Sequence, residues 1–593
     1  MKKSSLYYLL SLVVVLSMLM AACQPAATPT EAPAQPQPAT EEPAMPTEAP
    51  MEETEAPMET EAPMETEAPM ETEAPAETGD LMSKSAESCD YGGEFLSIEA
   101  LDQRTVKFTL CYPDPAFPSK VAFNVFSIAD SDHLNETGGD SIAMSDNANG
   151  TGPFTLENWA RGDSVTYTAN PNYWGNVPAY ETLIIRWSEQ SAQRTLELQS
   201  GQADGIDQVQ PEDFEVISGD PNLQLIPREA LSIFYIGFQV DLPPFDNEEV
   251  RQALAMAIDR QRIVDEYYPE GSSVAKVFAP PSLNPGFEDA EGFYDYDPDG
   301  AVAALEAAGF DFGQEISLYY RNVTRGYLPT PDKVAQEIQA QLAEIGVNVR
   351  IEEVESTTFI DNSSAGQYGM YLLGWGADYP DATNFYDYHF ANDNNAQFGT
   401  LFPDIVDALR AAGQTSDVEE RLSLYADANA ALKQHVPMIP VAHGASAVAF
   451  QAGVENAMTG PLANEPFYLM NPGKDILVWV QSGEPASIWC SDETDGESLK
   501  ACQQVYEPLL NYEPGGVEVV PWLAESYDVN EEATEYTFTL REGVTFHNGA
   551  TLDANDVVAS YSAQWDAADP NYKGRTTTFE YFGAFFGAHL NAP

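Results

Sequence analysis

The chain has 593 residues, of which 44% are hydrophobic, and its formal net charge is −68. This length excludes a single ordinary domain and predicts a globular protein of roughly two to four domains. A surface this acidic repels nucleic acid and anionic lipid headgroups, so we expect no nucleic-acid partner.

The first residues have the pattern of an export signal. Lys2 and Lys3 precede the apolar run YYLLSLVVVLSMLM, and two alanines precede Cys23. The run is short for a membrane span, and residues 1–22 resemble a bacterial lipoprotein signal peptide with a lipid attached at Cys23. An uncleaved signal anchor is the alternative. Both interpretations place the protein outside the cytoplasm, on the outer face of the cell membrane.

Residues 23–85 differ from the rest of the chain in composition. Proline, glutamate, threonine, alanine and methionine dominate, and the unit TEAPME repeats between residues 54 and 71. A segment without aromatic or β-branched aliphatic residues buries too little apolar surface to fold, so we expect a disordered tether. Its reach lies between about 40 Å as a flexible coil and about 180 Å as extended polyproline.

Two segments far apart in the chain have the alternating pattern of β-hairpins. FLSIEALDQRTVKFTL at 95–110 alternates around a turn near Asp102, and YTFTLREGVTFHNG at 536–549 alternates in the same way. The residues after the second segment have helical patterns and give no further strand. Because a sheet with one buried face needs more than two strands, we expect residues near 94–110 to complete the sheet that contains 536–549.

Apart from Cys23, the cysteines are Cys89, Cys111, Cys490 and Cys502. None forms a CxxC pair, which makes a zinc ribbon or a thioredoxin-like site a poor interpretation. In an exported protein two disulfides are the better one, and three pairings are possible. We favour Cys89 with Cys111, which flank the first hairpin, and Cys490 with Cys502.

The middle of the chain predicts a β-α-β unit. EISLYYRN at 315–322 has a strand pattern, an amphipathic helix begins after Thr330 and ends at Gly346, and 347–355 alternates as a strand. GMYLLGW at 369–375 adds another strand. Ligands of open α/β sheets lie beyond the carboxyl ends of the strands. This rule places two loops at the cleft, NVTRGYLP with Arg325 and ADYPDAT with Asp378.

Several longer stretches together carry a family resemblance over about residues 90–593. The chain resembles family 5 extracellular solute-binding proteins, the oligopeptide- and dipeptide-binding components of ABC importers. The resemblance implies a monomer that captures a peptide between two lobes and delivers it to the permease subunits, with no chemistry and no cofactor. The stretches are PWLAESYDV, YTFTLREGVTFHNGATLDANDVVASY, VKFTLCYPDPAF, GTGPFTLENWARGDSVTYTANPNYWG, TLELQSGQADG, PPFDNEEVRQALAMAIDRQRIVD and GWGADYPDATNF.

The order of these stretches departs from the family. The stretch from DILVWVQSGEPASIW to DANDVVASY opens the mature family members, whereas here it follows FYLMNPGK, which resembles their end. We therefore expect an α/β, two-lobed periplasmic-binding-protein-like fold that is circularly permuted and carries an additional small α+β domain. The expected parts are the additional domain at 86–148 and 516–593, lobe I at 149–245 and 441–515, and lobe II at 246–440.

The resemblance also implies site residues. An aspartate at the position of Asp378 in GWGADY binds the peptide α-ammonium in the family, and the alternative is a turn residue that caps backbone amides. Gly374 and Trp375 would supply strand-edge hydrogen bonds and an apolar wall. Arg325 or Arg321 would neutralise the peptide carboxylate unless it is solvated. Further cleft candidates are Glu484 and Trp489 in SGEPASIW.

Other ligands and activities have weaker support. Asp295 to Glu306 match the EF-hand expression, but the helix pattern that starts at Pro298 removes Glu306 from the loop, so we expect no metal. The six histidines give no metal-binding or triad spacing, which leaves an anchored hydrolase as a remote alternative. Relatives also take oligosaccharides or metal chelates, and His389 beside the Asp378 loop could contact a chelate.

Overall fold

The structure is a computed structural model that describes residues 80–592 except 284–285, 287–291, 393–394 and 576–577. The predicted signal peptide, Cys23 and most of the predicted tether lie outside the described residues. The tether was predicted to end at residue 85, and this boundary is wrong. Residues 83–85 form strand β1 (Ser83–Ser85), which pairs with β2. None of the helices in the described part of the chain is long and apolar enough to cross a membrane.

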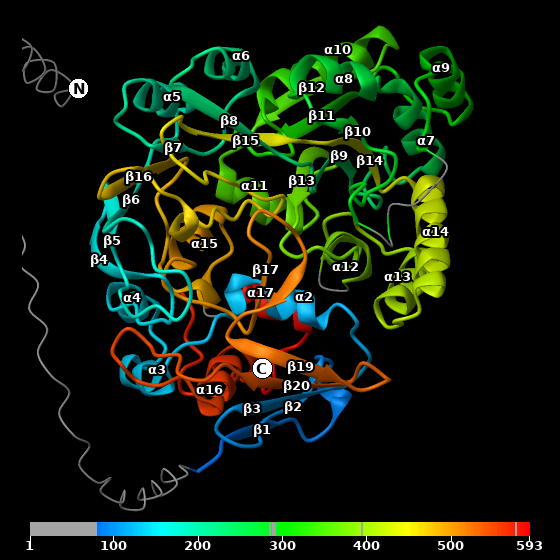
Figure 1. Ribbon diagram of the computed structural model, residues 1–593. Helices are drawn as coiled ribbons and strands as arrows, with labels where there is room; N and C mark the ends of the chain where they lie inside the picture. Colours follow the sequence, from blue (N-terminus) through cyan, green and yellow to red (C-terminus); the bar gives the residue numbers. More distant parts are fainter. Residues whose placement is uncertain (1–79, 284–285, 287–291, 393–394, 576–577, 593) are drawn as a thin grey trace, which may run out of the picture. The chain divides into compact units, whose positions relative to one another are not determined.

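The first of three large sheets builds lobe I. It has seven strands in the order β4-β5-β6-β16-β7-β15-β8, and β16 runs parallel to β6 although some 290 residues of sequence separate them (Figure 1). Trp479 of β16 is completely buried in the core below the sheet. The elements of lobe I are β4 (Phe154–Ala160), β5 (Ser164–Ala169), β6 (Thr182–Trp187), α5 (Ser191–Gln199), β7 (Gly205–Ile206), α6 (Phe214–Ser218), β8 (Leu223–Arg228), β15 (Ser446–Gln451), β16 (Ile476–Gln481) and α15 (Gly496–Cys502).

The second sheet builds lobe II and contains the predicted β-α-β unit. Its order is β10-β14-β9-β13-β11-β12, with β12, β11 and β13 parallel. Thr330 occupies the N-cap of α10, as expected, but its side chain makes no capping hydrogen bond. The elements of lobe II are β9 (Ser232–Phe238), α7 (Glu248–Ala257), α8 (Arg260–Tyr267), β10 (Ser273–Val274), α9 (Pro298–Ala307), β11 (Glu315–Tyr320), α10 (Pro331–Glu344), β12 (Asn348–Glu353), α11 (Ser356–Ser364), β13 (Met370–Gly376), α12 (Thr383–Tyr386), α13 (Pro403–Gly413), α14 (Val418–His435) and β14 (Met438–His443).

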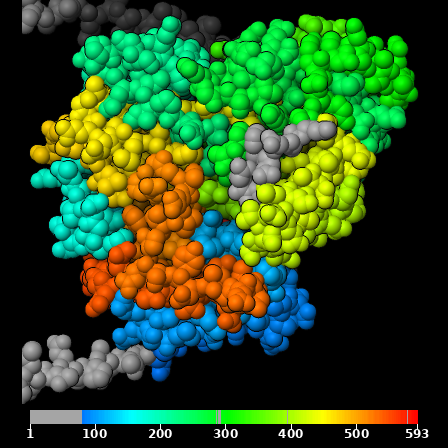
Figure 2. Space-filling model, turned by 45° about the vertical axis from the view of Figure 1, so that its right-hand side comes forward, coloured from blue at the N-terminus to red at the C-terminus, as the bar shows by residue number. Residues whose placement is uncertain are grey.

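The third sheet joins segments from the two ends of the described chain, as the sequence predicts. Its order is β1-β2-β3-β20-β19, and Thr109 of β3 pairs with Glu535 of β20. Figure 2 shows the orange C-terminal part lying directly on the blue N-terminal part. Phe95 and Phe586 pack in its core with ring centres 4.7 Å apart. The elements of this third domain are β2 (Phe95–Ala100), β3 (Thr105–Leu110), α2 (Phe117–Val121), α3 (Ser131–Thr137), α4 (Ser141–Asp146), β19 (Ala524–Val529), β20 (Glu535–Leu540), α16 (Ala554–Trp565) and α17 (Glu580–Phe586).

One strand of the predicted second hairpin does not exist. β20 pairs with β19, which precedes it, and with β3. The residues after β20 form turns with an isolated bridge between Thr545 and Thr551. The alternating pattern therefore identified β20 correctly but not its partner. A small sheet outside this domain pairs β17 (Leu510–Tyr512) with β18 (Val519–Pro521).

The chain crosses between the two lobes at positions that differ from the predicted boundary. β8 ends in the lobe I sheet at Arg228, and β9 begins in the lobe II sheet at Ser232. The return crossing lies between β14 and β15, at Gly444 and Ala445. The boundary predicted after residue 245 is therefore too late, because the buried strand β9 belongs to lobe II.

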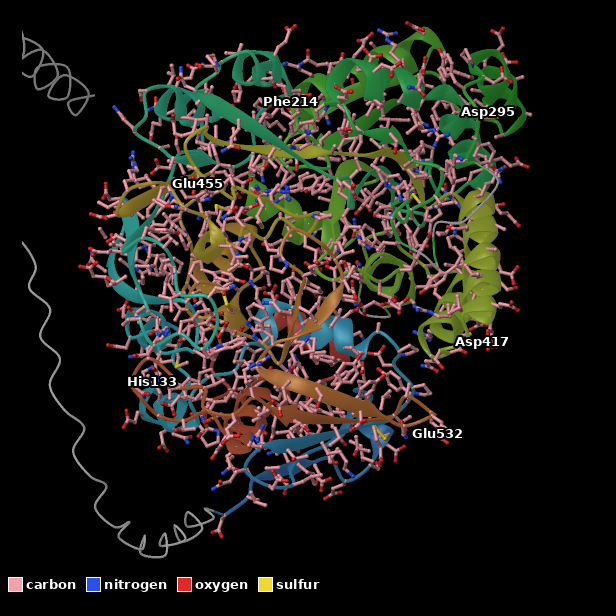
Figure 3. All side chains as sticks on the ribbon, viewed as in Figure 1. His133, Phe214, Asp295, Asp417, Glu455 and Glu532 are labelled. Atoms are coloured by element: carbon pink, nitrogen blue, oxygen red, sulfur yellow. A yellow bond between two sulfur atoms is a disulfide. The ribbon has the colours of Figure 1, made fainter. Side chains whose placement is uncertain are left out.

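The cysteines form the two favoured pairs, with Cys89 joined to Cys111 and Cys490 joined to Cys502. At the EF-hand-like stretch, α9 begins at Pro298, and the Asp297 side chain accepts a hydrogen bond from the amide of Gly300. Figure 3 shows Asp295 at the outer edge of lobe II. Within the described residues, no group of three or more histidine, cysteine, aspartate or glutamate side chains is arranged to hold a metal ion.

Candidate ligand-binding site

A cavity of about 610 Å³ is lined by residues of both lobes and of the third domain. The loops after β11, β13 and β16 contribute to it, in agreement with the rule that ligands lie beyond the carboxyl ends of strands. Both lobe crossings also line it, through Leu231 and Gly444. Its volume lies in the range of small-molecule sites in proteins.

Asp378 is the best-defined polar group of the cavity. The Tyr581 hydroxyl donates a hydrogen bond to Asp378 Oδ1 at 2.8 Å, and Asn384 Nδ2 donates one to Oδ2 at 3.0 Å. Among the described residues no cation pairs with this carboxylate. Burial raises the pKa of the Asp378 carboxyl to about 6, against the lowering effect of the two hydrogen bonds. The carboxylate therefore has two neutral hydrogen-bond donors but no cationic partner in the described chain.

Trp375 and Gly374 line the cavity beside Asp378. Asn384 Oδ1 accepts hydrogen bonds from Trp375 Nε1 and from the amide of Asp378, so one side chain fixes the whole loop. The Trp375 ring stacks on Tyr388 with centres 4.7 Å apart. Gly374 pairs with β9, and the pairing of β13 with β11 ends at Tyr371. A β-carbon at Gly374 would lie 2.4 Å from the Ile233 carbonyl oxygen, so no larger residue fits.

The two arginine candidates both line the cavity but differ in their partners. Arg325 Nη1 of lobe II lies 3.6 Å from Glu497 Oε1 of lobe I. Burial would lower the pKa of Arg325, but Glu497 together with Tyr327, Asp495 and Asp207 outweighs this effect and raises it. Arg321 donates hydrogen bonds to Ser356 Oγ and to the Tyr327 hydroxyl, both at 3.0 Å, and forms no ion pair with any described residue.

Two predicted cleft residues do not line the cavity. Glu484 is exposed, and its carboxylate accepts hydrogen bonds from Trp159 Nε1 and the amide of Gly162, at the turn between β4 and β5. Trp489 is 3% exposed and packs edge-on against Phe579 in the core. Both predictions were wrong because only the later part of the loop after β16, from Thr494 onward, returns to the cavity.

The lobe I wall of the cavity contains a buried ion cluster that was not predicted from the sequence. Arg228 contacts Asp207 at 3.3 Å and Glu465 at 2.6 Å, and Lys500 contacts the same two carboxylates. Burial would raise the pKa of Asp207, but Lys500 and Arg228 outweigh it and lower that pKa. These residues are scattered over the sequence, so no local pattern could have grouped them.

His389 lines the cavity but is almost completely buried. Its Nδ1 lies 2.7 Å from the Phe385 carbonyl oxygen, and burial lowers its pKa to about 3. Its ring packs edge-on against Trp375 and Phe278. These contacts give the imidazole a structural position in the core of lobe II.

The family profile described as "Bacterial extracellular solute-binding proteins, family 5 Middle" matches residues 68–397 and 518–583. The chain belongs to this family. Among curated relatives of this family 5 protein, Di/tripeptide-binding protein 1 of Pseudomonas aeruginosa is 30% identical over 64% of this chain and 71% of its own length. Heme-binding protein A of Haemophilus influenzae is 28% identical over 63% of this chain and 69% of its own.

Solved structures agree with the fold of a two-lobed periplasmic binding protein. An ABC transporter-associated periplasmic binding protein from Helicobacter pylori, in complex with the peptide STSA, superposes with a TM-score of 0.56 at 25% identity. The similarity covers 61% of the family 5 protein described here and 71% of that chain.

Proposed function

We propose that this family 5 protein binds peptides in the cavity, with Asp378 accepting hydrogen bonds from the peptide α-ammonium. The observation that carries the proposal is the carboxylate of Asp378, which lines the cavity and pairs with no cation among the described residues. A partly buried carboxylate of this kind gains most from a ligand that brings a positive charge and several donors. The peptide-binding relatives favour the same ligand class over a sugar or a metal chelate.

The peptide carboxylate would be neutralised by an arginine on the opposite loop. Arg321 supports this assignment because its guanidinium has hydroxyl partners but no carboxylate partner in the described chain. Arg325 would have to exchange Glu497 for the ligand. Both arginines lie on the loop after β11, and Asp378 lies on the loop after β13, so a peptide would lie across the carboxyl ends of neighbouring strands.

The bound peptide would then be delivered for import into the cell. In this proposal the protein is a monomeric lipoprotein, anchored through Cys23 to the outer face of the bacterial cell membrane, that passes peptides to the permease of an ABC transporter and carries out no reaction on them. The signal-like residues 1–22 and the tether composition of the following residues support the anchor. Metabolic labelling with a fatty acid tests it, and we expect incorporation that Cys23→Ala abolishes.

We further propose that the chain is a circular permutant of the family. The profile matches in two separate segments, and the second one pairs with the first in a single sheet. The amide of Glu94 donates a hydrogen bond of 2.7 Å to the carbonyl of Phe586, so the joined segments are in direct contact. A rearranged chain, with residues 475–592 linked ahead of residues 80–474, should fold and bind the same ligands. A chain that lacks 475–593 and still binds them would contradict the proposal.

A thermal-shift screen tests the ligand class. Residues 80–593 are mixed with peptides that have a free or an acetylated amino terminus, and with oligosaccharides. A ligand at about a hundred times its dissociation constant adds about 2.7 kcal/mol of stability, which gives a clear rise in melting temperature. We expect free-amino peptides alone to stabilise the protein, and Asp378→Ala to abolish the effect. Equal stabilisation by acetylated peptides would remove Asp378 from this role.

A further inference from the structure

Some of the charged residues that line the cavity neutralise one another in ion pairs. On the lobe I wall, Arg228 and Lys500 are neutralised by Asp207 and the more deeply buried Glu465. Across the cavity, Arg325 forms its ion pair with Glu497. These pairs contribute little net charge to the space that a ligand would occupy.

The remaining charged residues of the cavity are mostly acidic. Glu229, Asp495 and Glu580 line it together with Asp378, and none of the four forms an ion pair with a described residue. Among the described cations that line the cavity, Arg321 is the one without an ion pair. A bound peptide with free ends would use Asp378 and Arg321 for its own terminal charges. Three carboxylates then remain in the lining, of which Glu229 and Glu580 are exposed and Asp495 accepts a hydrogen bond from the amide of Ser498.

Two uncharged oxygen atoms of residues that line the cavity also lack hydrogen-bond donors in the part of the chain that the structure describes. Gln481 is 1% exposed and lines the cavity, and no hydrogen-bond donor among the described residues reaches its Oε1. Its Nε2 is fixed by the carbonyl oxygens of Gly483 and Glu497. The Oδ1 of Asn464, another lining residue, also has no donor in the described chain. Both oxygens are shielded from solvent, so a donor group of a ligand reaches them only if the lining side chains move.

We propose that the cavity selects peptides with a cationic side chain, lysine or arginine. An ammonium or guanidinium group balances the carboxylates of Glu229, Asp495 and Glu580, whereas an acidic side chain meets repulsion. This inference rests on the proposed peptide-binding function and names the class of peptide.

Calorimetric titration of the protein with matched tripeptides tests the selection. Ala-Lys-Ala is compared with its neutral analogue Ala-norleucine-Ala, and Ala-Arg-Ala with Ala-citrulline-Ala. We expect each cationic peptide to bind about tenfold more tightly, and the ratio to shrink as the salt concentration rises from about 0.05 M to about 0.5 M. Equal affinities within each pair would overturn the selection and leave peptide binding intact. If none of the four peptides bound, the proposed function and this inference would both fall.

A charge-neutralised variant separates the cavity from the acidic surface as a whole. The triple variant Glu229→Gln, Asp495→Asn, Glu580→Gln should lose most of the cationic preference, measured as the ratio of the two affinities within each peptide pair. Asn is chosen at 495 because it can still cap α15. The control variant neutralises three exposed acids outside the cavity, by Glu531→Gln, Glu532→Gln and Glu542→Gln. A preference that both variants lose equally would contradict the assignment to the cavity.

Discussion

Tyr581 donates a hydrogen bond of 2.8 Å to the carboxylate of Asp378, which lies 203 residues earlier in the chain. Tyr581 belongs to helix α17 of the third domain, and Asp378 follows strand β13 of lobe II. The third domain therefore contributes directly to the cavity. The contact stabilises the charged form of Asp378, because a carboxylate accepts this hydrogen bond better than a neutral acid does.

Tyr581→Phe removes this donor and should weaken the binding of free-amino peptides about threefold to tenfold at neutral pH, which corresponds to the usual net contribution of one hydrogen bond. The loss arises from a higher pKa of Asp378 and a less fixed carboxylate. Calorimetric titration measures it, with Tyr527→Phe on the exposed strand β19 as control. Wild-type affinity in the Tyr581 variant would show that the hydroxyl has no part in binding.

Binding of free-amino peptides should weaken as the pH falls below neutrality. Burial raises the pKa of Asp378 to about 6, and only the ionised form attracts an ammonium group. The carboxylate is mostly ionised at pH 7 and half protonated near pH 6. Below that, the affinity should fall about tenfold per pH unit. Titrations between pH 5 and pH 8 measure the profile, which Asp378→Asn should flatten. A wild-type profile without this dependence would contradict the role of Asp378.

The disulfide between Cys490 and Cys502 closes the segment that carries Asp495, Glu497 and Lys500 into the cavity wall. Replacing both cysteines by serine should cost about 3 kcal/mol of unfolding free energy and also weaken ligand binding, because the wall segment becomes less ordered. Urea denaturation and calorimetric titration measure the two effects.

The control for this experiment is the other disulfide. Replacing Cys89 and Cys111 by serine loosens one end of the third sheet, and neither cysteine lines the cavity. We expect this variant to lose a similar amount of stability but to keep the wild-type ligand affinity. If both double variants bound with the same reduced affinity, the effect on binding would be global.

Lys500→Met should destabilise the fold by about 3–5 kcal/mol, because it leaves the buried carboxylates of Asp207 and Glu465 with Arg228 as their remaining close cation. Urea denaturation measures the change. Arg161→Met is the control, since its ion pair with Asp146 is about half exposed and should be worth less than about 1 kcal/mol. Equal losses in the two variants would show that burial does not set the strength of the cluster.

Local periodicity predicted the elements whose contacts lie close in the sequence. The β11-α10-β12 unit and the β2-β3 hairpin follow from apolar spacing and turn residues, and the expected sharing of a sheet by 94–110 and 536–549 follows from two strands that lacked partners. Periodicity does not identify a partner, which explains the wrong hairpin after Leu540.

The cavity was harder to predict because most of its contacts join distant segments. Asp378 and Arg325 follow strands whose carboxyl ends meet, so one topological rule found them, and Gly374 and Trp375 at the end of β13 came from the family resemblance. Tyr581 and the buried cluster around Lys500 depend on packing between domains, which has no signature in a local stretch. The same limit explains the wrong assignment of Glu484, whose neighbour Trp159 lies in another strand.

The pairing of β3 with β20 has a consequence for the biosynthesis of the protein. Arg104 beside β3 donates to the carbonyl of Leu540, 436 residues further along, so the third sheet cannot be completed until synthesis has passed Leu540. Contacts of such long range form slowly, and an unpaired strand edge invites aggregation in the meantime. Lys107 lies in the middle of β3 and pairs with Glu99 and Glu535 in the folded sheet. It therefore places a charge on β3 before the partner strand β20 is available. A charge at such a position is one of the features that limit edge-to-edge aggregation of unpaired strands.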